Sequence, residues 1–264
     1  RQMTGTGIGM FGMSGSLALA IAPAIAMELM NSGGFTTMIH VSSAILLAAL
    51  ALGLFFPFEK TLQPETPVER ASKHRSLRDT IEKSAVLPSV IIGCVTLTMS
   101  AVTTYVPLYG TTMGLDNTGF FFTIYALGLL IVRAVIGRFI DRFGVLTTTL
   151  PSLACMLLAM LLLAFANGLG MLLLSGFLYG AGFGGAQTTM QSLSVMNAPS
   201  DRFGAANGTF FIGFDIGIGF GALLAGTLCD YFGFSNMYLI CSVFILIATV
   251  LMLKGHPGTE IPSP

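Results

Sequence analysis

Asp215 is an acidic residue within a long apolar segment, where a carboxylate could carry a proton or bind a positively charged group. It follows Gly204 by 11 residues, which is about 16 Å along a helix. On a helical wheel it points about 160° away from a stripe of small residues at Gly213, Gly217 and Gly221. Because a carboxylate facing lipid is costly, we expect Asp215 to face protein or water. Proton or substrate coupling and a hydrogen-bonded structural role are its two interpretations.

Neutral polar residues recur at helical spacing in two other apolar segments. Thr96, Ser100 and Thr103 repeat at i, i+4 and i+7, and Gln187 and Gln191 share one face of a later segment. Uncharged hydrogen-bonding groups among Met and Phe suit a small neutral or amphipathic compound, so these residues are candidates for the wall of a substrate cavity. The alternative is that they hydrogen-bond neighbouring helices to one another.

A short motif with an acid and a base joins two of the apolar segments. The sequence from Gly137 to Gly144 has the form G-x-x-x-D-R-x-G, with Asp141 and Arg142 at its centre. Asp141 is placed to accept hydrogen bonds from the N–H groups that open the next helix. Arg133 lies two turns earlier on the same helical face, so we expect it to belong with this loop as part of a latch. Binding of an anionic group is its alternative role.

The composition shows which elements must position these residues. The chain is 54% hydrophobic and only 9% charged, whereas a soluble domain carries roughly 25% charged residues. The apolar runs lack the alternation of a membrane barrel and are long enough to cross a bilayer as helices. We therefore predict an all-α integral membrane protein with about eight transmembrane helices. The expected spans are 6–30, 35–57, 86–113, 118–140, 145–167, 169–196, 204–230 and 234–253.

Positive residues predict the orientation of these helices. If the eight spans alternate, eleven of the twelve Lys and Arg residues fall on one side, and the exception is Arg133. Since Lys and Arg accumulate in cytoplasmic loops, both ends of the chain are expected in the cytoplasm. The expected location is the inner or plasma membrane of the cell. The formal net charge of +0 offers no surface for nucleic acid.

The first two spans resemble the last two. At an offset of 201 residues, the small-residue stripe that starts at Gly12 falls on the stripe at Gly213, and Gly34-Phe35 then aligns with Gly233-Phe234 after a two-residue gap. A repeat of six helices follows, with four helices expected before the first residue. The expected divisions are the last two helices of a first half, a cytoplasmic linker, a complete second half and a cytoplasmic tail, at 1–58, 59–84, 85–254 and 255–264.

The loop motif and its position resemble the major facilitator superfamily, whose halves carry such a loop between their second and third helices. The resemblance covers helices five to twelve of twelve and implies a major-facilitator-type helical bundle. The first span, through Gly12, Ala22, Pro23 and Ala26, is similar to the helix-five motif of proton-coupled drug antiporters. The resemblance implies that the loop latches one conformation by contacting the start of helix five, residues 1–7 here.

Taken together, these features predict a secondary active transporter, not an enzyme, that exports a small organic compound in exchange for protons, acting as a monomer. The four cysteines are far apart in apolar segments, so neither a metal nor a cofactor is expected. One alternative is a non-transporting or truncated membrane partner. Another is an intramembrane serine protease that uses Ser14, in a G-x-S-G sequence, with His40.

Overall fold

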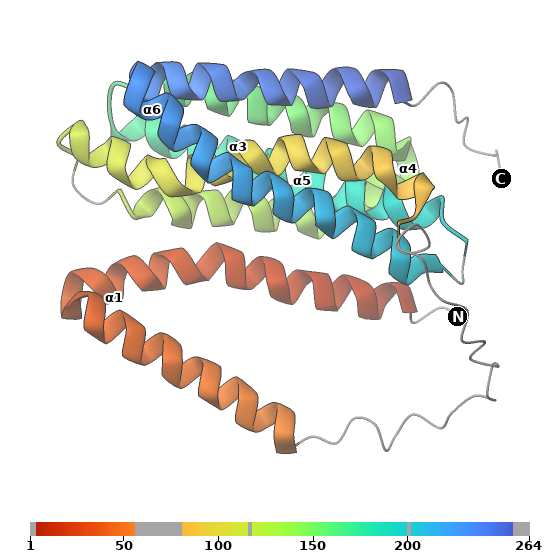
Figure 1. The fold of residues 1–264 in the computed structure, drawn as a ribbon, viewed down its shortest axis with the longest axis horizontal. Coiled ribbons are helices and arrows are strands. Elements are labelled where there is room, and N and C mark those ends of the chain that lie inside the picture. Colours follow the sequence, from red (N-terminus) through yellow and green to blue (C-terminus); the bar gives the residue numbers. More distant parts are fainter. Residues whose placement is uncertain (1–3, 56–80, 116–117, 200–201, 256–264) are drawn as a thin grey trace.

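A computed structural model describes residues 4–55, 81–115, 118–199 and 202–255, and every regular element in these ranges is a helix (Figure 1). Five ranges within them are long and apolar enough to cross a membrane. The elements are α1 (Thr4–Phe55), the short 3-10 helix η2 (Lys83–Ala85), α3 (Val86–Thr112), α4 (Phe120–Ala164), α5 (Leu169–Met196) and α6 (Phe203–Gly255).

The three longest elements are hairpins of two helices that meet at a glycine. Gly34 in α1, Gly144 in α4 and Gly233 in α6 have φ of 75° to 80° and ψ of 169° to 175°. This backbone region is essentially restricted to glycine, because a Cβ would clash there. In Figure 1 the arms of α1 and of α6 fold back on one another at these points. Two helices each from α1, α4 and α6, with α3 and α5, make the eight that the sequence predicts.

The hairpin glycines also bear on the internal repeat. Gly34 and Gly233, which the sequence aligns with one another, have the same φ of 75° and ψ values of 175° and 170°. The two aligned glycines thus occupy equivalent turns, and Gly144 of α4 adopts nearly the same conformation. The division into a partial first half and a complete second half remains a prediction.

The helices from α3 onwards form one packed bundle, in which α4 packs chiefly on α5 and α3 chiefly on α6. Aromatic side chains fill its centre: Tyr179 and Phe183 of α5 are fully buried, and Tyr179 stacks on Tyr125 of α4. The Tyr179 hydroxyl lies 2.6 Å from the hydroxyl of Thr98 on α3. This contact satisfies two buried polar groups and joins a third helix to the α4–α5 pair.

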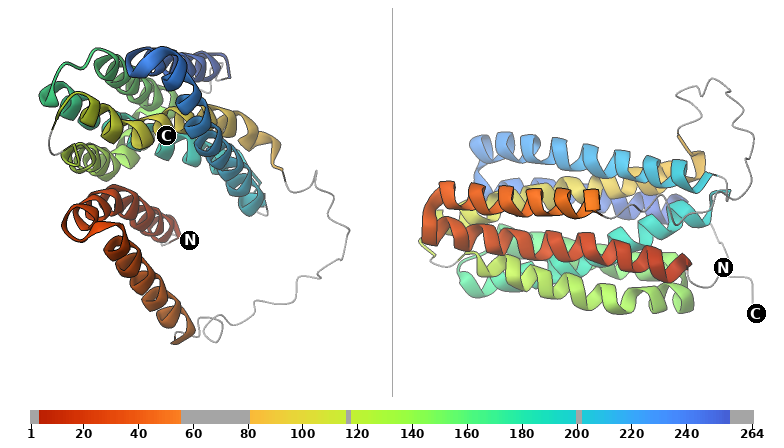
Figure 2. Two further views of the ribbon diagram at one scale, coloured as in Figure 1. Left: turned by 60° about the vertical axis from the view of Figure 1, so that its left-hand side comes forward. Right: turned by 90° about the horizontal axis from the view of Figure 1, so that it is seen from below.

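Among the described elements, α1 contacts only α4. Its second arm diverges from the rest of the bundle in Figures 1 and 2, and large apolar side chains such as Leu46 and Phe55 on this arm are exposed. Exposed apolar side chains also cover the outside of α6, where Phe220 and Leu223 are 66% and 72% exposed. An apolar exterior over a packed interior is the surface that a lipid bilayer solvates.

Three glycines of α6 allow its backbone to approach α3 closely. A Cβ added to any of them would lie 2.1 to 2.4 Å from a backbone carbonyl oxygen of α3. The pairs are Gly213 with Ser89, Gly217 with Gly93 and Gly221 with Leu97. This stripe of small residues, which the sequence predicts to pack on another helix, packs on α3, in the way that small residues join membrane helices.

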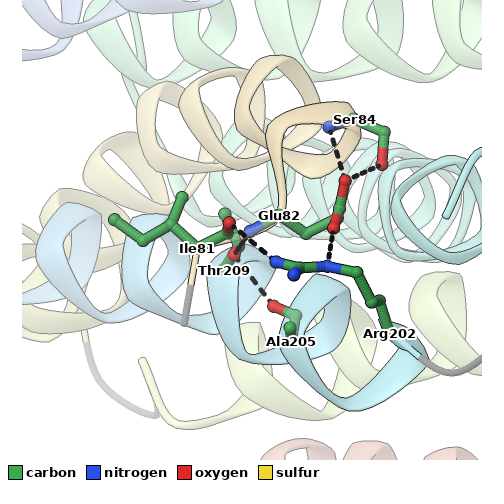
Figure 3. Close-up of polar contacts among 6 residues, drawn as sticks. All are labelled: Ile81, Glu82, Ser84, Arg202, Ala205 and Thr209. Carbon is green, nitrogen blue, oxygen red and sulfur yellow. Dashed lines mark hydrogen bonds and ion pairs between the residues drawn. The ribbon is translucent and has the colours of Figure 1, made fainter. Parts of the chain in front are cut away.

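Glu82 and Arg202 form an ion pair at the end of the bundle where α3 and α6 begin (Figure 3). A second Arg202 nitrogen donates to the Ile81 carbonyl oxygen at 3.2 Å, and the Glu82 backbone N–H donates to the Thr209 hydroxyl at 2.9 Å. The Glu82 carboxylate also accepts a hydrogen bond from the Ser84 hydroxyl at 3.2 Å. We call these contacts the Glu82–Arg202 clamp, because they attach the residues before α3 to the first turns of α6.

The clamp predicts a pH dependence of stability. The hydrogen bond from Arg202 lowers the pKa of Glu82 below its ordinary value of 4.5. Because the folded pKa lies below the unfolded one, the stabilisation is complete above about pH 4.5 and is lost as the pH falls through the folded pKa. Glu82→Gln should therefore be less stable than the wild type at pH 7, and the difference should shrink towards pH 3.

Thermal unfolding in detergent micelles at several pH values measures this difference. Glu28→Gln, which removes an exposed carboxylate from α1, is the control and should follow the wild type at each pH. A difference between Glu82→Gln and the wild type that does not change with pH would contradict the clamp.

The glycine contact predicts opposite effects for two neighbouring substitutions. Gly217→Ala places its Cβ 2.0 Å from the Thr96 hydroxyl and 2.3 Å from a carbonyl oxygen, and should destabilise the protein by about 1–3 kcal/mol. Gly219→Ala meets nothing within 4 Å and should be neutral or stabilising by up to about 1 kcal/mol, because alanine favours helix. Chemical unfolding of both variants tests the contact, and equal effects would contradict it.

Candidate functional site

Polar side chains of α4, α5 and α6 meet in two contacts inside the bundle. Arg133 of α4 donates a hydrogen bond from its Nη2 to the side-chain oxygen of Gln187 on α5. One turn further along α5, Gln191 donates to the side-chain oxygen of Asn207 on α6 at 3.2 Å. Because Gln187 and Gln191 share one face of α5, we treat the four residues as one polar row.

The polar row runs inwards from the end of the bundle that carries the Glu82–Arg202 clamp. Gln191 and Asn207 lie about 8 Å and 6 Å from the ends of their helices, counted from Met196 and Phe203. Gln187 lies about 14 Å from Met196, and Arg133 lies about 16 Å from the Gly144 turn. The row therefore begins about 6 Å from the helix ends and ends near the depth of the membrane centre.

Gln187 and Gln191 belong to the predicted cavity wall together with three residues of α3, and the structure separates the two groups. The Thr96 hydroxyl donates to the Phe214 carbonyl oxygen of α6 at 2.9 Å, within the glycine contact. Ser100 is buried, and Thr103 donates to a carbonyl oxygen of its own helix at 3.0 Å. Thr96 thus joins α3 to α6, whereas the two glutamines contact Arg133 and Asn207, and a cavity wall formed by the five residues remains a prediction.

Asp215 lies on the opposite side of α6 from the glycine contact and is exposed. It follows Phe203 by twelve residues, or about 18 Å of helix. On its own face, Gly208 and Gly219 are also exposed, and a Cβ at either would meet nothing within 4 Å. The carboxylate therefore sits near the depth of Arg133, on a surface that no described part of this chain covers.

The predicted loop latch lies at the same end of the bundle as the Glu82–Arg202 clamp. Asp141 and Arg142 are exposed, as is Gly137, and the Arg142 guanidinium lies 5.3 Å from the centre of the Phe143 ring. Gly144 provides the hairpin turn of α4. Arg133, which the sequence groups with this loop, lies about 16 Å from the Gly144 turn and contacts Gln187 instead.

The helix-five motif lies in the first arm of α1, the helix that packs on α4. Ala22 is exposed and Ala26 half-buried, while the side-chain surroundings of Gly12 and Pro23 lie outside the described part. The same holds for Ser14, the nucleophile of the protease alternative. The start of the chain, residues 1–3, which the latch hypothesis involves, is also outside it.

A groove of about 750 Å³ follows the α3–α6 contact on the outside of the bundle. Its lining is almost wholly apolar and includes Cys94, Leu97, Ile216 and Phe220. None of the four residues of the polar row lines it. The groove therefore suits an apolar neighbour, and the candidate site for polar chemistry is the polar row together with Asp215.

Two contacts, one within this site and one at the end of the bundle, were not predicted from the sequence. Asn207 is the polar partner of Gln191, but a single asparagine in the first turns of a helix has no periodicity that would reveal it. Glu82 and Arg202 are 120 residues apart and each resembles an ordinary charge in a loop. Only the parallel packing of α3 on the first arm of α6 brings them together.

Comparison with known proteins shows what this chain is similar to. A staphylopine export protein of Staphylococcus aureus is 23% identical over 261 residues, covering 95% of this chain and 65% of that protein. An uncharacterized MFS-type transporter of Escherichia coli is 24% identical over 253 residues, covering 93% of this chain and 59% of that protein. A multi-drug resistance efflux pump PmrA homolog of Lactococcus lactis is 30% identical over 174 residues, 61% of this chain and 42% of that protein.

The chain thus spans about three-fifths of the length of the first two relatives. The family model described as Major Facilitator Superfamily matches residues 1–121 and 115–264. Its matches cover the whole chain, and the eight-helix fold agrees with the helical bundle that the loop motif implies. This chain belongs to the Major Facilitator Superfamily.

Proposed function

We propose that the protein is a secondary active transporter that exports a small organic compound by alternating access, with protons as the coupling ion. The observation that carries the proposal is the position of Asp215, a carboxylate near mid-membrane depth on an exposed face of α6. An ionisable group at this depth is costly in lipid, so it requires water or a protein partner. A carboxylate that meets water from alternate sides can take up a proton on one side and release it on the other.

The printed names of two relatives, an export protein and an efflux pump homolog, support export as the direction of transport. The distribution of charge supports the orientation. In the described part, Arg138, Arg142, Arg202 and Lys254 lie at one end of the bundle, and the positive-inside rule places that end in the cytoplasm. In this orientation the outer contact of the polar row lies nearer the cytoplasm, from which an exported compound must enter.

The loop around Asp141 is proposed to control this opening. Its exposed acid and base lie at the same end as the first turns of α1, and α1 packs on α4. A contact between loop and helix start would hold the two in one arrangement, and its release would permit the other. Two alternative arrangements of packed helices are what alternating access requires.

Replacement of Asp215 by asparagine tests the coupling. Asp215→Asn keeps the size of the side chain and removes its titration, so proton movement coupled to transport should fall at least about tenfold. The measurement uses the natural full-length protein in proteoliposomes that contain a pH-sensitive dye. A panel of anionic, neutral and cationic fluorescent compounds is applied, and the compound that the wild type moves fastest is then used for the variants.

Asp230→Asn is the matched control, because Asp230 is an exposed carboxylate at the far end of the same arm of α6. This control should move protons as the wild type does. Proton movement in Asp215→Asn at the wild-type rate would remove Asp215 from the coupling mechanism.

A further inference from the structure

We infer that Arg133 and Gln187 form a binding site for an anionic group, a carboxylate or a comparable oxyanion, of an organic compound. The inference rests on the proposed function only in treating that compound as the transported one. It assigns Arg133 a role in binding in place of the loop latch.

The position of its charged group separates Arg133 from the loop. Long basic side chains near a helix end extend towards the membrane surface and place their charge in water. The Arg133 guanidinium does not, because it donates to Gln187, which itself lies about 14 Å from the end of α5. The charge is therefore held near the membrane centre, out of reach of the lipid headgroups. A cation at this depth is energetically costly.

The contact with Gln187 orients the guanidinium. Gln187 is 9% exposed, so its amide has little freedom, whereas Arg133 is half-buried. An amide oxygen accepts a hydrogen bond without cancelling the positive charge of its donor. A guanidinium that is fixed in this way presents a planar set of N–H donors, the geometry that matches a carboxylate through two parallel hydrogen bonds.

The outer contact of the polar row, between Gln191 and Asn207, lies between Arg133 and the end of the bundle. Both side chains are half-buried amides, which can donate to an anion and carry no negative charge that would repel it. The row therefore provides successive hydrogen-bond donors at two depths and a positive charge at the inner one. This order suits a compound whose anionic group enters first.

Dansylglycine is a suitable probe, because it carries one carboxylate and its fluorescence rises in an apolar site. Its methyl ester has the same body without the charge. The wild-type full-length protein in detergent should bind dansylglycine at least about tenfold more tightly than the ester. Competition with inorganic phosphate separates an organic carboxylate from a free anion, and phosphate at equal concentration should not displace the probe.

Three variants then test the residues. Arg133→Gln should weaken dansylglycine binding by on the order of ten- to a hundredfold and leave ester binding unchanged. Arg133→Lys keeps the charge without the planar set of donors and should be intermediate. Gln187→Glu keeps Arg133 and its hydrogen bond but adds a negative charge beside it, so it should lose the preference for the carboxylate as Arg133→Gln does.

Arg138→Gln is the control, since Arg138 is an exposed arginine on the same helix, and it should bind both probes as the wild type does. Size-exclusion chromatography shows whether each variant is folded. If Arg133→Gln does not fold, Gln187→Glu still tests the site. The inference is overturned if the wild type shows no preference for the carboxylate, if phosphate displaces the probe, or if Gln187→Glu retains the preference. Binding at equilibrium needs no proton gradient, so a failure of proton coupling would leave this result standing.

Discussion

The cost of placing a charge in hydrocarbon is the constraint on which the rest of this structure depends. It explains why the charged residues of the described helices gather at helix ends, where the Glu82–Arg202 clamp and the Asp141 loop lie. It also makes the two charged residues that lie far from helix ends candidates for function. Arg133 and Asp215 are about 16 Å and 18 Å into their helices, and each requires an environment other than lipid. The proposed chemistry follows from these two residues and the surfaces that they face.

Glycine decides how the helices that carry these residues are arranged. At Gly34, Gly144 and Gly233 it permits a turn that other residues rarely adopt, so long apolar helices fold back as hairpins. At Gly213, Gly217 and Gly221 it allows α6 to meet α3 backbone to backbone. That contact fixes the rotation of α6 about its own axis. The opposite face, with Asp215, is consequently turned away from α3.

The sequence was a good guide to features that lie along one helix. The spans, the glycine turns and the face of α6 that packs can be predicted because each depends on local periodicity or on one residue type. Features that join two helices were predicted less well. Thr96 and Gln187 were grouped by polarity, but Thr96 bonds to α6 whereas Gln187 bonds to Arg133, and only the packing of the helices distinguishes them. Arg133 was grouped with Asp141 because both lie on one helical face, a pattern that contains no information about α5.

The central claim is that Asp215 faces an aqueous pathway, and cysteine accessibility tests it most directly. After replacement of the four native cysteines, Asp215→Cys is compared with Val243→Cys on the other arm of α6. The two residues lie at matched depth, twelve residues from Phe203 and from Gly255 respectively, and both are exposed in this chain. In native membranes a charged, water-soluble maleimide should label the cysteine at position 215 and leave that at 243 unlabelled. Equal protection of both positions would place Asp215 against lipid or protein and contradict the account.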